Sequence, residues 1–300
     1  MSLATYTEET ENKKTLNFDM FIRLAKSLFK SPTGLFGFVI LLVVILIAVF
    51  ANVLAPHDPI KVDPANSLIP PVWQSDGTSQ HILGTDNLGR DILSRVLVGS
   101  RVSLIVGFFS VILAGVIGLI IGLVAGFYGG WIDNILMRIV DSFLSIPSIL
   151  FVLVLLAVFN PSVTVLVIVI GITNWVIYAR MARGEALSIK EKDFVKASRA
   201  IGTKNGTIMF KHILPNLMPS FIVISALSVA TTIILESSLS FLGLGIQPPD
   251  ISWGAMLTDG RDYMATNWWL STFPGLAITI TVLGIMFLGD WLRDVLDPKS

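Results

Sequence analysis

The sequence contains no cysteine, and only 14% of its 300 residues are charged. The missing cysteine excludes disulfides, thiolate metal sites and cysteine nucleophiles. The low charge excludes an ordinary soluble domain, in which about a quarter of the residues are charged. The three histidines, His57, His81 and His212, are scattered without the spacing of metal ligands, so we expect no metal site.

Catalytic motifs are missing as well. No Walker A sequence occurs, and Gly84–Arg90, which has the glycine spacing of a phosphate loop, lacks the Lys-Ser/Thr pair that must follow. No Ser/His/Asp motif or paired-carboxylate motif stands out. We therefore predict a non-catalytic chain that binds no cofactor of its own.

Apolar residues, by contrast, are abundant. They make up 53% of the chain, and the mean hydropathy is +0.78. This composition predicts an all-α polytopic membrane protein that is surrounded by lipid. The formal net charge of zero gives no reason to expect a nucleic-acid partner.

Six stretches are long and apolar enough to cross a membrane, which takes about 20 residues. They are 35–54, 102–127, the two parts of 142–179 on either side of Asn160-Pro161, 220–244 and 271–289. The remaining chain then divides into a tail (1–34), a loop (55–101), a second long loop (180–219) inside a five-span core (102–289), and a C-terminus (290–300). From Asp91 onward, the first loop has the apolar pattern of an interfacial helix that leads into the second span.

The distribution of lysine and arginine predicts the orientation. With both termini inside the cell, the inside segments hold 16 of the 21 basic residues and the outside segments hold five. The opposite orientation reverses that ratio. We therefore predict six spans with N-in/C-in topology, which places 180–219 in the cytoplasm.

Polar and small residues within the spans have two interpretations each. Glu236 is costly in lipid, so it is either a pathway or gate residue or a buried hydrogen-bond anchor. Asp141, at the edge of the third span, is a second pathway candidate or a helix-start or interhelix partner. Gly118, Gly122 and Gly126 form a small-residue stripe that packs either within this chain or against a partner subunit.

The most informative stretch is Arg183–Asn216, a charged segment that carries an apolar stripe. Phe194, Ala197, Ser198 and Ile201 lie at i, i+3, i+4 and i+7, which is one face of a helix. Gly202 follows at the position of a helix-terminating glycine, and Pro215 closes the segment. An ordinary positive loop needs no such stripe, so we expect a short helix that docks against the chain's own spans or another protein.

This segment resembles the EAA loop of binding-protein-dependent ABC importer permeases. The Glu-Ala-Ala core corresponds to Lys196-Ala197-Ser198, the family glycine to Gly202, and the closing Ile-x-Leu-Pro to 212–215. Lys196, Ser198 and His212 depart from the family residues, so no role of the family glutamate is transferred. The resemblance implies an ATPase-coupling helix and its flank, comprising Phe194, Lys196, Ala197, Ser198, Arg199, Ala200, Ile201, Gly202, His212, Leu214 and Pro215.

Other long motifs resemble the C-type subunit of dipeptide/oligopeptide permeases. They include HILGTDNLGRDILSRVLVGSRVSL, GFYGGWIDNILMRIVDSFLSIPS, LESSLSFLGLGIQPPDISWGAML and LGDWLRDVLDP. The resemblance implies a type I ABC importer permease in the cytoplasmic membrane of a prokaryote. The implied partners are a homologous B-type permease, two ABC ATPases that bind ATP and Mg²⁺, and an extracytoplasmic solute-binding protein.

The resemblance identifies the class of transporter more narrowly than the substrate that it carries. Di- and oligopeptides are the expected substrates, while nickel-chelate, glutathione and other peptide-like importers share the same motifs. A different class, an ion-coupled secondary transporter that uses Glu236 and Asp141, predicts transport by this chain alone. The lack of inverted repeats in the sequence argues against that alternative.

Overall fold

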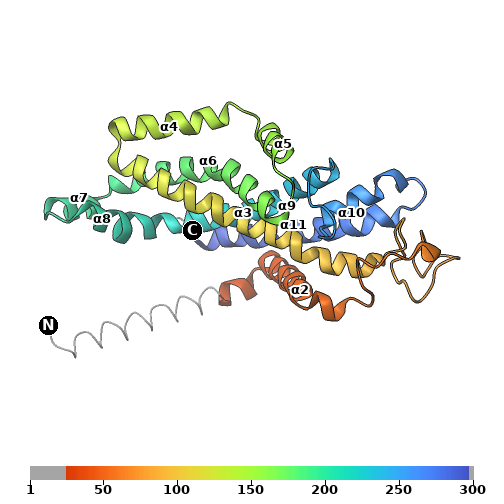
Figure 1. Cartoon of the computed structure of the whole chain (residues 1–300). Helices are drawn as coiled ribbons and strands as arrows, with labels where there is room; N and C mark the ends of the chain where they lie inside the picture. Colours follow the sequence, from red (N-terminus) through yellow and green to blue (C-terminus); the bar gives the residue numbers. More distant parts are fainter. Residues whose placement is uncertain (1–24, 297–300) are drawn as a thin grey trace, which may run out of the picture.

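The computed structural model describes residues 25–296, and its regular elements are helices (Figure 1). The long helices lie side by side. Helices α7 and α8 lie at one end of the molecule, and α10 lies at the other end together with the loop that precedes α3 (Figure 1). The expected tail, 1–34, lies mostly outside the described residues.

The first two long helices among residues 25–296 are α2 (Pro32–Leu54) and α3 (Ile92–Tyr128). Asp91 caps α3 by accepting a hydrogen bond from the Ser94 backbone nitrogen at 2.8 Å. At 1.5 Å per residue, the 37 residues of α3 extend about 55 Å, well beyond a hydrocarbon core of about 30 Å. The helix expected as a separate interfacial element is therefore the beginning of α3 itself.

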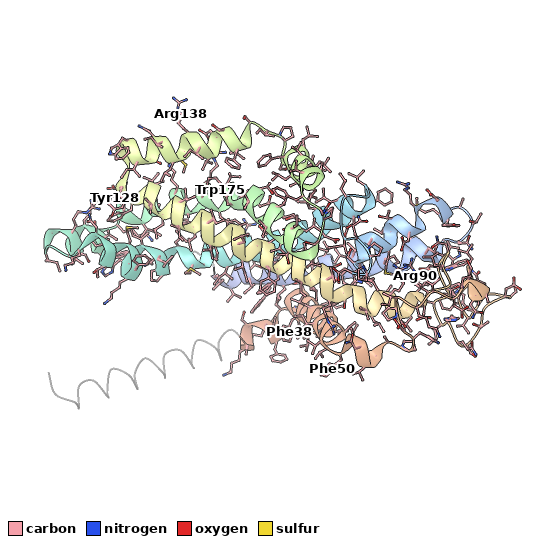
Figure 2. The ribbon with its side chains drawn as sticks, in the orientation of Figure 1. Phe38, Phe50, Arg90, Tyr128, Arg138 and Trp175 are labelled. Carbon is pink, nitrogen blue, oxygen red and sulfur yellow. The ribbon has the colours of Figure 1, made fainter. Side chains whose placement is uncertain are left out.

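The third expected span is bent. Helices α4 (Gly130–Leu144) and α5 (Ser148–Val158) meet at an angle of 80°, and α6 (Val163–Lys190) follows. Pro147 explains the break, because a proline disfavours helical geometry in the residue before it. Arg138 on α4 points away from the other helices (Figure 2).

The number of spans depends on this bent pair. Five helices among the described residues are long and apolar enough to cross a membrane, and α4 with α5 supplies the sixth only if the pair counts as one span. The expected span beginning at Ser142 is corrected accordingly, since Ser142 lies in the last turn of α4.

A series of short helices leads from α6 to the next long one. These are α7 (Asp193–Ala200), α8 (Asn205–Thr207) and the π-helical η2 (Ile208–Ile213), which continues into α9 (Leu214–Phe241). Pro215 was expected to close the segment, but the helix runs through it. A proline inside an α-helix normally clashes with the carbonyl of the residue four positions earlier. The π-helical turn before Pro215 is wider, because the Leu214 nitrogen bonds to the Met209 carbonyl, five residues back, and this relieves the clash.

The chain ends in α10 (Trp253–Gly260), the short η3 (Arg261–Tyr263) and α11 (Trp269–Leu296). The single turn η1 (Pro64–Asn66) lies in the loop before α3. Helices α3 and α6 form the most extensive pair, and the largest apolar core lies among α2, α3, α9, α10 and α11. Most remaining apolar side chains of α2, including Phe38 and Phe50, point outward (Figure 2).

Candidate functional site

Helix α7 ends as the sequence predicts. Gly202 has φ of +81°, a conformation that glycine adopts without steric cost. Its nitrogen bonds to the Arg199 carbonyl, and the Thr203 nitrogen bonds to the Ser198 carbonyl at 3.1 Å. These two bonds form a Schellman cap, which fixes the length of α7 at eight residues.

One side chain holds α7 against the rest of the molecule. Val195 is fully buried and belongs to an apolar cluster with Ile208, Ile213 and Leu217, and α7 packs on η2 and on the end of α6. The face opposite is free. Phe194 is 42% exposed and Ile201 is 83% exposed, and Ala197 between them is exposed as well.

Three of the four residues of the predicted stripe are therefore exposed, and only Ser198 is half-buried. Sequence reasoning missed Val195 as the anchor, because its one-residue offset from Phe194 gives it no place in the stripe. Lys196, Arg199 and Ala200 are exposed around the same face.

The three departures from the family pattern lie on or beside α7. Lys196 pairs with Glu191 at 3.1 Å, and both side chains are more than half exposed. The Ser198 hydroxyl donates to the Phe194 carbonyl at 2.9 Å, and the half-buried ring of His212 lies 6.2 Å from the Phe194 ring. Leu214 is half-buried and Pro215 is exposed.

The glycine stripe of α3 faces α6 of the same chain. A Cβ added at Gly118 lies 2.3 Å from the Trp175 carbonyl, and one added at Gly122 lies 2.3 Å from the Ala179 carbonyl. The corresponding Cβ at Gly126 lies 2.8 Å from the Ala186 Cβ. Of the two interpretations, the structure places the stripe in packing within the chain.

Polar contacts fasten α6 to α4 and to α3 near α7. The Arg183 guanidinium donates two hydrogen bonds to Asp133 of α4, and Lys190 donates to the Gly126 carbonyl at 2.9 Å. Arg199 of α7 lies 5.6 Å from the Phe127 ring centroid, at the end of α3. Arg199 and Val195 thus connect α7 to α3, α6 and η2, while Arg183 and Lys190 join α6 to α4 and α3.

Glu236 is a hydrogen-bond anchor at the opposite end of α9. It is fully buried, and one carboxylate oxygen accepts from the hydroxyls of Ser240 and Ser252, each at 2.8 Å. Ser252 is also the N-cap of α10 and accepts from the Ala255 nitrogen. Glu236 therefore fixes the start of α10 on α9.

Asp141, the other pathway candidate, has little around it. Its side chain is 61% exposed, and the nearest basic group is that of Arg180 at 4.0 Å. It lies in the last turn of α4, so it does not start a helix. It is a loose interhelix partner between α4 and α6.

A polar notch lies among α3, α6 and α9, and no sequence pattern indicates it because its members are far apart in the chain. Its volume is about 50 Å³, room for at least one water molecule. Ser110 is almost fully buried there, and its hydroxyl has no partner within residues 25–296. Asn174, Tyr178, Ser228 and Thr231 line the same notch.

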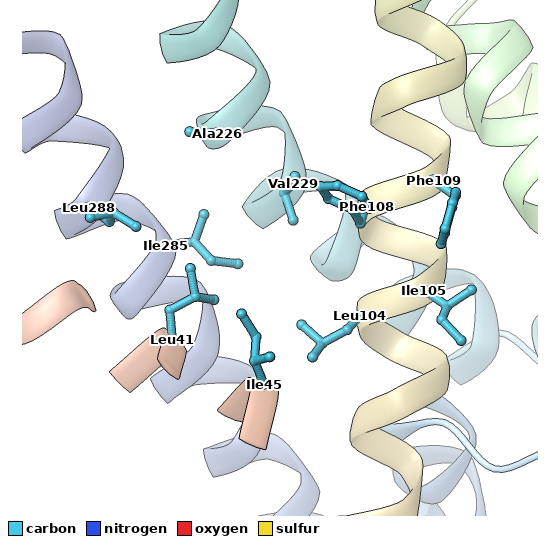
Figure 3. A pocket seen from close by; sticks show the side chains of 10 residues that line it. All are labelled: Leu41, Ile45, Leu104, Ile105, Phe108, Phe109, Ala226, Val229, Ile285 and Leu288. Carbon is cyan, nitrogen blue, oxygen red and sulfur yellow. The ribbon is translucent and has the colours of Figure 1, made fainter. Parts of the chain in front are cut away.

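A larger pocket has the opposite character. It lies among α2, α3, α9 and α11, has a volume of about 440 Å³, and is lined only by apolar side chains such as Leu41, Phe108 and Ile285 (Figure 3). Such a surface offers a hydrated solute no hydrogen bond. Polar groups in a membrane need protein or water around them, so the notch is the stronger candidate for a solute pathway.

The loop before α3 and the helix α10 form one folded unit. Arg90 and Arg95 each donate to Asp259 of α10 at 2.9 Å, and both also contact the buried Asp86. The indole nitrogen of Trp269 donates to the Thr85 carbonyl at 3.1 Å. The two segments expected outside the membrane thus present a single ordered surface.

Comparison with known proteins places this architecture in a family. The family described as "Binding-protein-dependent transport system inner membrane component" matches residues 118–300. The description "N-terminal TM domain of oligopeptide transport permease C" matches residues 20–71.

Full-length relatives agree with these matches. The chain is 42% identical over 274 residues to the dipeptide transport system permease protein DppC of Alkalihalophilus pseudofirmus, covering 91% of this chain and 88% of that protein. It is 44% identical over 263 residues to the glutathione transport system permease protein GsiD of Escherichia coli O6:K15:H31, covering 87% and 84%. It is 38% identical over 300 residues to the probable D,D-dipeptide transport system permease protein DdpC of Escherichia coli K12, covering 100% and 98%.

A solved structure supports the fold. A chain of the inward-facing MetNI methionine ABC transporter superposes with a TM-score of 0.56 at 20% identity, covering 67% of this chain and 96% of that one. The helical membrane architecture and the expected ABC importer permease fold are thereby confirmed. The chain belongs to the family of inner-membrane permease components of binding-protein-dependent transport systems.

Proposed function

We propose that this chain is the C-type permease subunit of an ATP-driven importer of di- and oligopeptides, and that α7 couples it to an ATPase subunit. The observation that carries the proposal is the exposed apolar stripe on α7. Phe194 and Ile201 stay open to solvent while Val195 locks the helix in place. A rigid helix with an unpartnered apolar face suits a groove in another protein.

The contacts of α7 support a role in transmitting force. A groove that moves α7 acts on α9 through the Val195 cluster and on α3 through Arg199 and Phe127. Closure of an ATPase pair then moves whole helices as rigid bodies and alternates access between the two sides. ATP and Mg²⁺ belong to the ATPase subunits in this scheme, and this chain binds neither.

The pathway is assigned to the polar notch. Ser110, Asn174, Ser228 and Thr231 supply hydroxyl and amide groups that match the hydrogen-bonding groups of a peptide backbone. A B-type permease on the same face completes the pathway. The solute-binding protein docks on the unit formed by the first loop and α10. Glu236 and Asp141 have no role in coupling ions.

The substrate follows from the relatives. Two of those compared are named as permeases for dipeptides or D,D-dipeptides, and a third for glutathione, itself a small peptide. Uptake of labelled dipeptide into vesicles that contain the complete transporter, with unlabelled glutathione as competitor, separates these substrates. Uptake that needs no ATP and no second subunit would instead support the ion-coupled alternative.

A charge placed on the α7 stripe tests the coupling role. In Ala197→Glu the new carboxylate lies on an exposed helix face, so folding is preserved while the apolar contact is lost. We expect normal insertion, loss of ATPase co-purification and loss of uptake. Asn134→Glu on α4 is the matched control, since it adds the same charge at an exposed helical position. Full uptake and normal co-purification in Ala197→Glu would show that α7 is not the docking element.

A further inference from the structure

Three metal-ligating side chains meet at the end of the molecule that carries α10. His57 follows the end of α2, His81 lies within the next loop, and Asp91 caps α3. The Asp91 Oδ1 atom lies 2.9 Å from His81 Nδ1 and 3.7 Å from His57 Nδ1, and one ligand atom from each residue lies within 4.8 Å of the others. The expectation that the histidines are scattered is therefore wrong for this pair.

The charge around Asp91 is not balanced by a basic residue. Its neighbours Asp86 and Asp259 share the guanidinium groups of Arg90 and Arg95. Asp91 is 1% exposed, and within residues 25–296 its ion-pairing partners are imidazoles alone. A buried carboxylate in such a place needs a cation, which is either a protonated imidazole or a metal ion.

The spacing suits a metal ion. Zinc binds histidine nitrogen at about 2.0–2.1 Å and carboxylate oxygen at about 2.0–2.2 Å, so ligand atoms in a tetrahedral site lie about 3.3 Å apart. The distances of 2.9 and 3.7 Å lie on either side of that value. The His57 side chain is 39% exposed, which leaves a way in from solvent and room for water as a further ligand.

A second layer of contacts orients these ligands. The other oxygen of Asp91 accepts from the Ser94 backbone nitrogen at 2.8 Å and from the Ser94 hydroxyl at 2.7 Å. The same hydroxyl accepts from the His57 backbone nitrogen at 3.0 Å. Ser94 thus holds Asp91 with Oδ1 directed toward the two imidazoles and holds His57 beside it, as outer-shell partners do in metal sites.

We propose that His57, His81 and Asp91 bind one divalent transition-metal ion of the zinc class, with water completing the coordination. The ion clips the end of α2 to the start of α3, two segments joined otherwise by a loop of 37 residues between Leu54 and Ile92. It is a structural clip at the face assigned to the solute-binding protein, and it does not depend on which solute is carried. Other ions with a preference for nitrogen and carboxylate ligands fit the same site.

The test uses the full-length chain in detergent, purified without a polyhistidine tag and stripped of metal. The chain has no cysteine and three histidines, so few background sites exist. We expect one equivalent of Zn²⁺ by calorimetry, and a visible absorption spectrum of Co²⁺ with nitrogen ligands that Zn²⁺ abolishes. His57→Ala should weaken binding at least about 100-fold, because its loss exceeds the effect of an outer-shell partner.

Two further variants keep the outcome clear if His81→Ala fails to fold. Asp91→Asn keeps a good helix cap but removes the charged ligand, so binding should be lost while the helix content is retained. His212→Ala removes the histidine outside the cluster and should bind as the unaltered chain does. Equal binding by the unaltered chain and His57→Ala, or no stoichiometric binding at all, would overturn the proposal and leave His81 as a hydrogen-bond partner of the cap.

Discussion

The closeness of α3 and α6 makes a quantitative prediction about Gly122. A Cβ at this position lies 2.3 Å from the Ala179 carbonyl oxygen and 2.7 Å from the Ala182 Cβ, whereas ordinary contacts begin at 3.4 Å. Both obstacles belong to a helix backbone or sit directly on it, so no side-chain rotation relieves them. The helices must separate by about 1 Å, a distance that close-packed interiors resist.

We therefore expect Gly122→Ala to lower the free energy of unfolding by about 1–3 kcal/mol, the usual cost of overpacking. Gly184 in α6 is the matched control, because a Cβ added there meets nothing within 4 Å. Gly184→Ala should raise stability by up to about 1 kcal/mol, since alanine is the better helix former. The same substitution thus has opposite signs at two positions of one helix pair.

The assay is a denaturant titration of the full chain in detergent, followed through its seven tryptophans. A parallel measurement of uptake in the assembled transporter shows whether the shift of α6 reaches function. Equal stability changes in the two variants, or none in Gly122→Ala, would refute the packing argument.

Three other predictions rest on single features. The chain lacks cysteine, so a single introduced thiol can be labelled without background. Asn174→Cys and Thr231→Cys in the notch should react with a charged, water-soluble thiol reagent, whereas Phe108→Cys in the apolar pocket should not. Equal labelling of all three variants would contradict the pathway assignment. Glu236→Leu deprives two serine hydroxyls of their acceptor and should cost about 1–3 kcal/mol, with faster proteolysis near α10, while Glu236→Gln should cost less. Arg95→Met leaves the buried Asp86 beside fewer positive charges and should lower the free energy of unfolding by about 3–5 kcal/mol. Arg261→Met, in the exposed pair with Asp262, should lower it by less than about 1 kcal/mol. Similar shifts of the melting temperature in these two variants would contradict the burial argument.

The membrane class and the position of α7 could be predicted from the sequence because both depend on local chemistry. Hydropathy over about 20 residues identifies a span without knowledge of its neighbours. Gly202 stops α7 because its positive φ is a property of the residue and its adjacent peptide bonds. The prediction that Pro215 ends the helical segment was wrong for a related reason. The local rule against proline in helices does not include the π-helical turn that accommodates it.

Which residues of the candidate site are exposed, buried or in contact was decided by tertiary structure. The sequence by itself determined that α7 is amphipathic, but only the packing of Val195 on η2 and α6 decided which of its faces is free. Glu236 could be a gate or an anchor until Ser252, 16 residues away, was brought within 2.8 Å. His57 and His81 looked scattered because their shared partner is the cap of a helix that begins only at Ile92. Each of these outcomes depends on contacts between segments that are distant in the chain, and such contacts leave no pattern in a local window of sequence.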